Sequence, residues 1–386
     1  MLDEARTETG VSKERCEMKK KVLVCLVSFL CFFGQALGRK VKNSDDYAVV
    51  LAGGNGMRLW PFSRENYPKQ FLSVCGDQTL IQQAVDRVSS VVKKENIWIG
   101  TTAKHKESVI EQVGQQIGRI VIEPGMRNTG PAILLSCFEI YKKDPEAVIV
   151  FLPSDPFIPN KDRFISFLDR AIDYVRKNER ICLLGLKPQY PATGYGYIEY
   201  DDSAQPLEGA PFQVKRFHEK PVLDVALRYC QQENMLWNIS MFCGKAKVFM
   251  QEFQKEAPDI FQGVKAFVEG EGKYEDIRAE SIDFAVMEKS KKISVLPADF
   301  EWCDVGNIEV FLALQQQWGI SDTHTMSVNA NNNMVCAPKK FVALVGVENL
   351  CVVETDDVLL ITKQGEAEKV KRLVRKLKKT DYDQYV

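Results

Sequence analysis

The chain has 386 residues, of which 45% are apolar and 27% are charged, as in ordinary globular proteins with room for two or three domains. Its net charge of −1 gives no electrostatic reason to expect a nucleic-acid partner or an anionic membrane surface. The eleven cysteines include no C-x-x-C pair. The sequence therefore predicts neither a zinc site nor a disulfide framework, but reduced thiols in a reducing compartment.

Residues 1–44 are predicted to be a leader. Within the segment 18–38, three lysines precede Val22–Phe33, which carries no charge, and small residues follow. This order is typical of a secretory signal peptide, and the apolar run is short for a membrane span. Three interpretations stay open, namely a true signal, a membrane-tethering leader, and an upstream extension that the working protein lacks. The fold prediction therefore leaves this segment out.

The stretch Tyr47–Leu72 carries the strongest functional signal. Ala48–Ala52 has the length and β-branched content of a buried strand. In the following Gly53-Gly54-Asn55-Gly56, three glycines allow a tight turn and let backbone N–H groups approach an anion. Arg58 and Lys69 add two cations. The pattern is not a P-loop, because G-x-x-x-x-G-K-[ST] is absent, but it predicts a polyphosphate site.

Strands and helices alternate in the next part of the chain. Thr79 and Gln82 form a predicted capping box that starts a helix reaching about Val92, and Pro131 suits the first turn of another helix. Strands are predicted at 96–100, 119–122, 147–152, 181–184 and 293–296, and helices at 104–117, 164–175 and 307–318. This alternation predicts an α/β fold with a mixed, mainly parallel sheet flanked by helices.

The pattern changes at two further points. Residues 194–244 carry longer strand-like runs around turns. Short β-type runs at 341–362 predict a small C-terminal β module, and apolar residues at helical spacing over 367–377 predict a terminal helix. Its basic face is predicted to be solvated, with membrane or partner binding as the alternative. We predict domains at 45–320 and 321–386.

Two aspartates are candidate metal ligands. Asp155 follows a buried strand, and ligands bind at the carboxyl edge of open parallel sheets. Asp304 precedes a predicted helix. Mg²⁺ is commonly held by one or two carboxylates together with substrate phosphates. The alternative is that Asp155 caps a turn and Asp304 a helix.

The full motif at 51–71, L-A-G-G-x-G-x-R-L-W-P-x-S-R-x-x-x-P-K-Q-F, is far more restrictive than its glycines alone. It resembles the signature of the sugar nucleotidyltransferases. Its L-W-P and P-K-Q-F portions resemble the bacterial mannose-1-phosphate guanylyltransferases, also called GDP-mannose pyrophosphorylases. Further matches follow in order, with E-P-x-x-R-N-T-x-P-A at 123–132, T-G-Y-G-Y-I at 193–198, F-x-E-K-P at 217–221 and S-I-D-F-A-V-M-E at 281–288.

This resemblance implies a Rossmann-like nucleotide-diphospho-sugar transferase fold, with 45–320 as the nucleotidyltransferase domain. It implies an enzyme that joins GTP and mannose 1-phosphate to GDP-mannose and releases diphosphate, with Arg58, Lys69 and Asp155 as catalytic residues. Mg²⁺ would be held by Asp155 and Asp304. The residues implied for the nucleotide are Leu51, Ala52, Gly53, Gly54, Gly56, Met57, Arg58, Asn128, Thr129 and Pro131. The residues implied for the sugar phosphate are Gly194, Tyr195, Glu219, Lys220 and Asn238.

The sequence departs from the family pattern at two places. Pro156 stands where the family reads His after the Asp155 position. Ile239 and Ser240 stand where a small residue and a glycine are usual, so we expect them to crowd the sugar pocket. Two alternatives therefore stay open. The chain is either a pyrophosphorylase for another nucleotide and sugar, or a nucleotide-sugar-binding regulator without turnover.

The predicted partners and location follow from this reaction. The substrates are GTP and mannose 1-phosphate, and no nucleic acid is expected. The enzyme needs GTP from the cytosol, which predicts a cytoplasmic location that the signal-like segment 18–38 leaves open. Membrane contact is expected only if the leader is retained, and a homodimer is left open.

Overall fold

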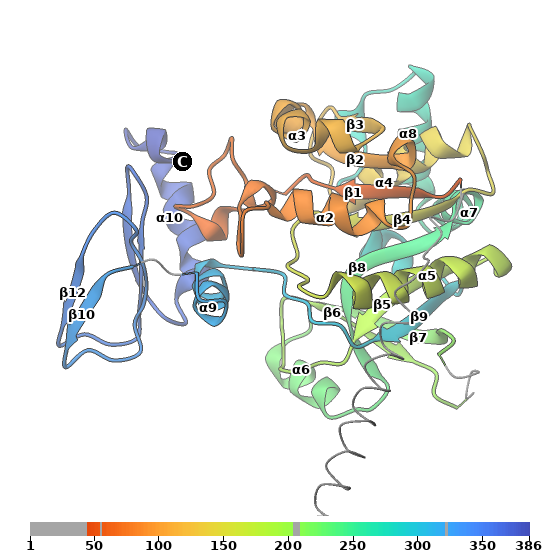
Figure 1. Ribbon diagram of the computed structural model, residues 1–386. Helices are drawn as coiled ribbons and strands as arrows, with labels where there is room; N and C mark the ends of the chain where they lie inside the picture. Colours follow the sequence, from red (N-terminus) through yellow and green to blue (C-terminus); the bar gives the residue numbers. More distant parts are fainter. Residues whose placement is uncertain (1–44, 55, 204–208, 321–322) are drawn as a thin grey trace, which may run out of the picture. The chain divides into compact units, whose positions relative to one another are not determined.

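A nine-stranded mixed sheet forms the centre of the structure, in the order β3-β2-β1-β4-β8-β5-β9-β7-β6 (Figure 1). Its strands are β1 Tyr47–Leu51, β2 Ile97–Thr102, β3 Arg119–Glu123, β4 Val148–Pro153, β5 Ile181–Leu186, β6 Gly196–Tyr200, β7 Phe212–Glu219, β8 Met235–Lys245 and β9 Ile293–Ala298. This computed structural model describes residues 45–54, 56–203, 209–320 and 323–386. The predicted leader at 1–44 lies outside these ranges.

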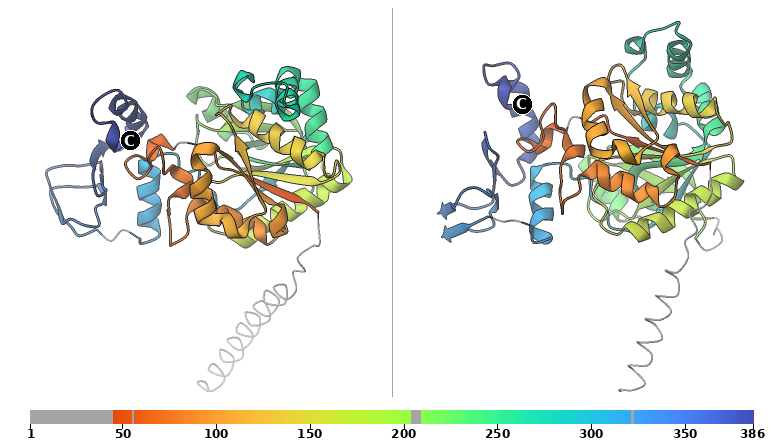
Figure 2. Two further views of the ribbon diagram at one scale, coloured as in Figure 1. Left: turned by 90° about the horizontal axis from the view of Figure 1, so that it is seen from above. Right: turned by 45° about the horizontal axis from the view of Figure 1, so that its top comes forward.

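Strand β1 is buried on both of its faces. Val49 packs into a first core cluster with the helices α4, α7 and α8, while Ala48 and Val50 pack into a second cluster with α2, α3 and α5. A strand covered on both sides needs a continuous apolar run, which explains the sequence of β1. Figure 2 shows the sheet between these helical layers. These helices are α2 Leu80–Ser89, α3 Lys106–Val113, α4 Thr129–Tyr141, α5 Lys161–Lys177, α7 Ala246–Glu256 and α8 Pro258–Glu269.

The first four strands are parallel, because β1 pairs in parallel with both β2 and β4, and β2 with β3. Parallel strands end at one edge of the sheet, and the loops that follow them meet there. The glycine loop, the loop before α4 and the Asp155 loop therefore come together, although they lie far apart in the sequence.

The other half of the sheet is organised around β8. This long strand pairs antiparallel with β4, β5 and β6, and β6 pairs antiparallel with β7. β5 and β9 keep one parallel pair. The prediction of a mixed sheet flanked by helices is confirmed, with its parallel pairs confined to β1–β4 and β5–β9. Helix α6 Leu223–Cys230 connects β7 to β8.

Most predicted elements are found with ends shifted by a few residues. The capping box is present, because Thr79 accepts from the Gln82 backbone N–H while the Gln82 side chain accepts from that of Thr79. The helix ends at Ser89 rather than Val92. The helix predicted over 104–117 is shorter, because single 3₁₀ turns stand at both of its ends. These 3₁₀ segments are η4 Ala103–His105 and η5 Gly114–Gln116.

The C-terminal segment, residues 323–386, contains five short strands, one α-helix and two single 3₁₀ turns. The strands form a two-stranded sheet and a three-stranded sheet. They are β10 Thr325–Val328, β11 Met334–Cys336, β12 Val342–Val345, β13 Leu350–Glu354 and β14 Leu359–Lys363, and the helix is α10 Val370–Leu377. Val370 and Val374 of α10 are buried in a third core cluster with Leu59 and with Phe311 of α9 Ile308–Gln317. This segment thus packs on residues that directly follow the glycine loop.

Candidate active site

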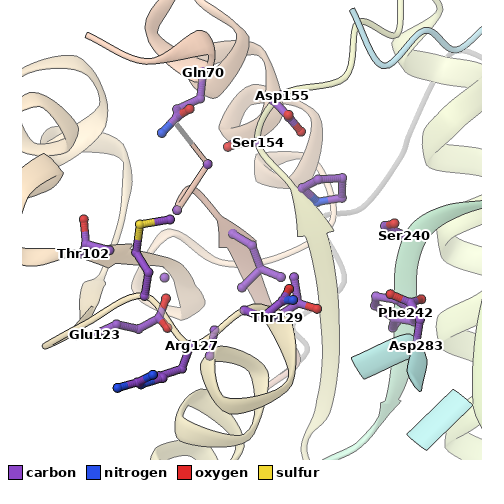
Figure 3. A pocket seen from close by; sticks show the side chains of 18 residues that line it. Gln70, Thr102, Glu123, Arg127, Thr129, Ser154, Asp155, Ser240, Phe242 and Asp283 are labelled. Carbon is purple, nitrogen blue, oxygen red and sulfur yellow. The ribbon is translucent and has the colours of Figure 1, made fainter. Parts of the chain in front are cut away.

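A cavity of about 330 Å³ opens at the carboxyl edge of the parallel strands. Figure 3 shows Thr102, Glu123 and Arg127 on one side of it and Ser240, Phe242 and Asp283 on the other. Six of the predicted site residues line it, namely Leu51, Gly53, Gly54, Asn128, Thr129 and Asp155. The cavity therefore joins the glycine loop, the loop before α4 and the loop after β4, as the parallel topology predicts.

Hydrogen bonds from neighbouring segments fix the glycine loop. The Ala52 carbonyl accepts from Thr101 Oγ1 at 2.8 Å and from Gln70 Nε2 at 3.2 Å. Gly56 has φ of +58°, and a Cβ built there would lie 2.5 Å from the Cβ of Lys69. Only glycine combines this backbone conformation with such a close approach. The signature glycine thus brings the Lys69 backbone against the loop.

Lys69 connects the two candidate metal ligands. Its ammonium forms an ion pair with Asp155, with Nζ 2.9 Å from Oδ2, and donates to the backbone carbonyl of Asp304. The Lys69 side chain is only 10% exposed. Burial raises the pKa of Asp304 above its usual value, the Lys69 charge lowers it, and the Asp155 charge raises it again. The carboxylates of Asp155 and Asp304 and the ammonium group of Lys69 are therefore close enough to interact electrostatically.

The carboxylates fit a hard divalent cation. Among the described residues, no group of three or more His, Cys, Asp or Glu side chains is arranged to hold a metal ion. Mg²⁺ does not need one, because it is commonly bound by one or two carboxylates, substrate phosphates and water. Burial and the like charge of Asp155 both disfavour the ionised form of Asp304, and a cation beside the pair would offset both effects.

Glu123 places a carboxylate inside the cavity. It ends β3, is buried, and accepts a hydrogen bond from Tyr274 Oη at 2.8 Å. Burial raises its pKa to about 7, although the tyrosine hydrogen bond acts in the opposite direction. A carboxyl group with this pKa changes its charge near neutral pH, so it is an acceptor whose strength depends on pH.

The loop before α4 is held in one conformation. Asn128 has φ of +66° and accepts from the Thr129 backbone N–H. Thr129 Oγ1 accepts from the Ile282 backbone N–H at 3.0 Å, and Gly130 packs so closely on the Glu280 carbonyl that a Cβ would lie 2.7 Å from it. These contacts hold residues 128–129 with their side chains toward the cavity, and they connect the loop to the segment that contains Asp283.

The sugar-side candidates meet around Gly196. In the sheet, Gly196 stands opposite Glu219 on β7 and Asn238 on β8. A Cβ at Gly196 would lie 2.6 Å from Glu219 Oε2, so the glycine makes room for this carboxylate. Asn238 Nδ2 donates to Asp283 Oδ1 at 2.9 Å. Burial and the charge of Glu219 raise the pKa of Asp283 to about 7.

Tyr195 and Lys220 complete this side. Tyr195 Oη donates to Asp304 Oδ1 at 3.1 Å, and its ring packs edge-on against Trp302. Lys220 has φ of +48° and pairs with Glu219, with Nζ 2.5 Å from Oε1. Tyr195 thus connects the predicted sugar residues to the candidate metal end of the site, while Gly194 has open space around it.

Comparison with known proteins identifies the family. Residues 47–319 match the model of the nucleotidyl transferase family. The chain belongs to this family. Residues 323–377 match a MannoseP isomerase/GMP-like beta-helix domain, so this nucleotidyltransferase carries a second recognisable region after the catalytic one.

Individual proteins similar to this chain give a more specific comparison than the family model. The nucleotidyltransferase is 34% identical over 362 residues to mannose-1-phosphate guanylyltransferase 2 of Escherichia coli O157:H7, covering 88% of this chain and 75% of that protein. It is 33% identical to the xanthan biosynthesis protein XanB of Xanthomonas campestris pv. campestris B100, covering 87% and 74%. A crystal structure described as mannose-1-phosphate geranyltransferase from Thermus thermophilus matches with a TM-score of 0.77 and 29% identity, covering 86% of this chain and 99% of that one. The predicted resemblance is confirmed.

Five predicted nucleotide residues of this transferase do not line the cavity, namely Ala52, Gly56, Met57, Arg58 and Pro131. Pro131 is buried in the first turn of α4, and Met57 packs on the third core cluster. Arg58 points to the C-terminal segment, where its Nε lies 2.8 Å from Glu368 Oε2. Arg58 is nevertheless close enough to Asp304 to lower that group's pKa.

The structure corrects the expectation about Ile239. Its side chain is 1% exposed and packs with Met241 and Cys243 in the second core cluster, on the opposite face of β8 from Leu236 and Phe242. Ile239 therefore does not crowd the sugar pocket. Ser240 does line the cavity, with φ of +58° and its backbone N–H donating to Asn238 Oδ1. A left-handed backbone explains why glycine is usual there.

Several cavity residues were not predicted as site residues. They include Gln70, Thr102, Glu123, Met126, Arg127, Ser154, Phe242 and Asp283. Glu123 had a local signal. Like Asp155, it is a carboxylate at the end of a predicted strand, and it belongs to the same motif as Asn128. Asp283 lies in the 281–288 motif, but its contact with Asn238 depends on the pairing of β6 with β8 and could not be predicted locally.

Proposed function

We propose that this chain is a mannose-1-phosphate guanylyltransferase, which joins GTP and α-D-mannose 1-phosphate to GDP-mannose and releases diphosphate. The observation that carries this proposal is the buried carboxylate of Glu123 in the same cavity as the glycine loop. Guanine presents two adjacent donors, its N1–H and its exocyclic amino group, and one carboxylate accepts from both. Adenine lacks this pair. The names of the relatives support the same choice.

In the proposed reaction a phosphate oxygen of mannose 1-phosphate attacks the α-phosphorus of GTP, and the bond from that phosphorus to diphosphate breaks. Such transfers depend on positioning and on stabilising charge. Lys69 is proposed to contact the phosphates, and its contacts with Asp155 and with the Asp304 carbonyl support this role. A bound Mg²⁺ would neutralise phosphate charge, and Asp155 and Asp304 are the residues proposed to hold it.

Glu219, Asn238 and Lys220 are proposed to bind the sugar phosphate. The first two flank Gly196 without a side chain between them, which leaves polar atoms for mannose hydroxyls. Lys220 offers an ammonium group to the phosphate, and its present partner Glu219 would remain for the sugar. Tyr195 keeps Asp304 in place by donating to its carboxylate.

The location of the enzyme in the cell, its oligomeric state and its domain division are also proposals. GTP supply favours a cytoplasmic location. None of the helices in the described ranges has the length and apolar character needed to cross a membrane. Membrane contact would depend on the leader, and a homodimer stays a proposal that sedimentation can test. The domain division at 45–320 and 321–386 also stays a proposal.

The test is steady-state diphosphate release from a panel of nucleoside triphosphates and sugar 1-phosphates. We expect the highest kcat/KM for GTP with mannose 1-phosphate. A preference for another pair would assign the enzyme to a different sugar nucleotide. Release with no pair, together with binding of nucleotide sugars, would identify the non-catalytic regulator.

A further inference from the structure

The C-terminal segment is packed onto the residues that follow the glycine loop. Ala367 and Val370 are buried in the same core cluster as Leu59. The Tyr385 carbonyl accepts from Trp60 Nε1 and from Arg64 Nη1, each at 2.7 Å. Figures 1 and 2 show α10 beside this part of the chain. These contacts fix the backbone that directly follows Arg58, the predicted phosphate ligand.

Glu368 lies on η8 Ala367–Lys369, directly before α10, and forms an ion pair with Arg58. The distance from Arg58 Nε to Glu368 Oε2 is 2.8 Å. The other carboxylate oxygen, Oε1, lies 3.5 Å from Asn307 Nδ2. Asn307 begins α9 only three residues after Asp304. The Glu368 carboxylate therefore lies between Arg58 and the segment that contains Asp304.

This geometry leaves one edge of the guanidinium for a ligand. The ion pair is made through Nε, and the arginine side chain is 45% exposed. A guanidinium presents several donors in a rigid fork, so it can pair with a carboxylate at Nε while its Nη groups contact phosphate. Arg58 also lies only two residues after Gly56, the last glycine of the loop.

We infer that Glu368 is a positioning residue that orients Arg58 toward the triphosphate, so that the C-terminal segment takes part in nucleotide binding. The inference rests on the proposed function, because it takes the nucleotide to be GTP. Glu368 touches no substrate in this account, and it acts through Arg58. Ala367 is buried in the core, and this packing holds the backbone of η8 so that the neighbouring carboxylate has a defined position.

The test compares Glu368→Gln with Asp357→Asn in the full chain. Asp357 is a matched control, because it is another exposed carboxylate of the C-terminal segment and pairs with Arg64 at 2.7 Å. We expect Glu368→Gln to raise the KM for GTP about two- to fivefold, the equivalent of one exposed ion pair, without changing the KM for mannose 1-phosphate or the Tm. Asp357→Asn should leave the KM for GTP unchanged.

A double variant tests whether Glu368 acts through Arg58 or through a general effect of its charge on GTP binding. In an Arg58→Ala background, Glu368→Gln should have no further effect on the KM for GTP. Additive effects would overturn the inference, and so would an unchanged or lower KM for GTP in the single variant. GTP binding measured by titration calorimetry keeps the two proposals apart. If the wild type binds GTP but makes no GDP-mannose, the proposed function fails, while weaker GTP binding by Glu368→Gln would still support the inference.

Discussion

The two sides of the active site are built differently. The nucleotide side consists of loops that follow the parallel strands β1, β3 and β4. The sugar side consists of side chains on the antiparallel strands β6, β7 and β8 and on the segment containing Asp283. Loops at the edge of a parallel sheet carry their residues in short local motifs. Residues on paired strands meet only through register, so the sequence reveals them less directly.

The difference also appears in how each side is fixed. The glycine loop is held by backbone contacts that only glycine allows, above all at Gly56. The sugar side has two non-glycine residues with positive φ, Lys220 and Ser240, and the nucleotide side has one, Asn128. Such conformations cost roughly 1–2 kcal/mol each and persist only where the surrounding sheet holds them. Substitutions are therefore tested by different quantities, the KM for GTP on the nucleotide side and the KM for mannose 1-phosphate on the sugar side.

The largest effect is expected at the candidate metal carboxylates. Asp155→Asn and Asp304→Asn should each abolish Mg²⁺-dependent turnover, because an amide keeps the shape but loses the charge that a hard cation prefers. The Tm should change little. The measurement is diphosphate release across a magnesium titration, with circular dichroism as a check of the fold. Active variants with an unchanged magnesium dependence would mean that these aspartates only cap a turn and a helix.

A somewhat smaller effect is expected at Lys69. Lys69→Met should lower kcat by about 10²- to 10³-fold, the typical loss on removing one donor to developing charge. Lys161→Met is the control, since Lys161 also pairs with an aspartate, Asp86 at 2.6 Å, but this pair joins α5 to α2 instead of the two candidate metal ligands. Steady-state kinetics of both variants decide the matter. Equal activities would remove Lys69 from the proposed chemistry.

Glu123 gives the nucleotide side a pH dependence. Its carboxylate must be ionised to accept from guanine, so the KM for GTP should rise as the pH falls through about 7. Glu123→Gln should remove this dependence and lower kcat/KM for GTP about 10- to 100-fold, because one guanine donor then lacks its acceptor, which costs about 1–3 kcal/mol. The KM for mannose 1-phosphate serves as the internal reference.

The same group affects stability with a defined sign. The folded pKa of Glu123 is about 7, above its ordinary value of 4.5, so the folded protein binds the extra proton in that interval. The free energy of unfolding should therefore decrease as the pH rises from 4.5 to 7. Urea unfolding at several pH values measures it. If Glu123→Gln shows the same slope as the wild type, other groups such as Asp283 account for it.

The smallest functional effect is expected from the departures on β8. Ile239→Ser should destabilise the protein by about 2–5 kcal/mol through a core cavity and a buried hydroxyl, yet leave the KM for mannose 1-phosphate unchanged. Ser240→Gly should alter stability by less than about 1 kcal/mol, since relieved strain offsets the greater freedom of the unfolded chain. Thermal unfolding and sugar kinetics test both. A lower sugar KM in Ile239→Ser would restore the crowding hypothesis.

Local sequence was enough to predict some of the cavity residues but not the contacts between distant parts of the chain, for physical reasons. Gly53 and Asp155 closely follow the ends of strands, and Thr129 begins α4, so a local pattern is enough to predict them. The ion pair of Arg58 with Glu368 joins residues some three hundred positions apart, and no local pattern contains it. The inward-facing Ile239 was misassigned, because a pattern of usual residues does not reveal which face of β8 each side chain occupies.

The central claim is that this site joins GTP to mannose 1-phosphate. The most direct measurement is phosphorus NMR of a reaction that contains the full chain, Mg²⁺ and both substrates. The account predicts that the GTP and mannose 1-phosphate signals disappear together and are replaced by GDP-mannose and diphosphate in equal amounts. Unchanged substrates at saturating enzyme, or release of GDP and phosphate without a sugar nucleotide, would contradict it.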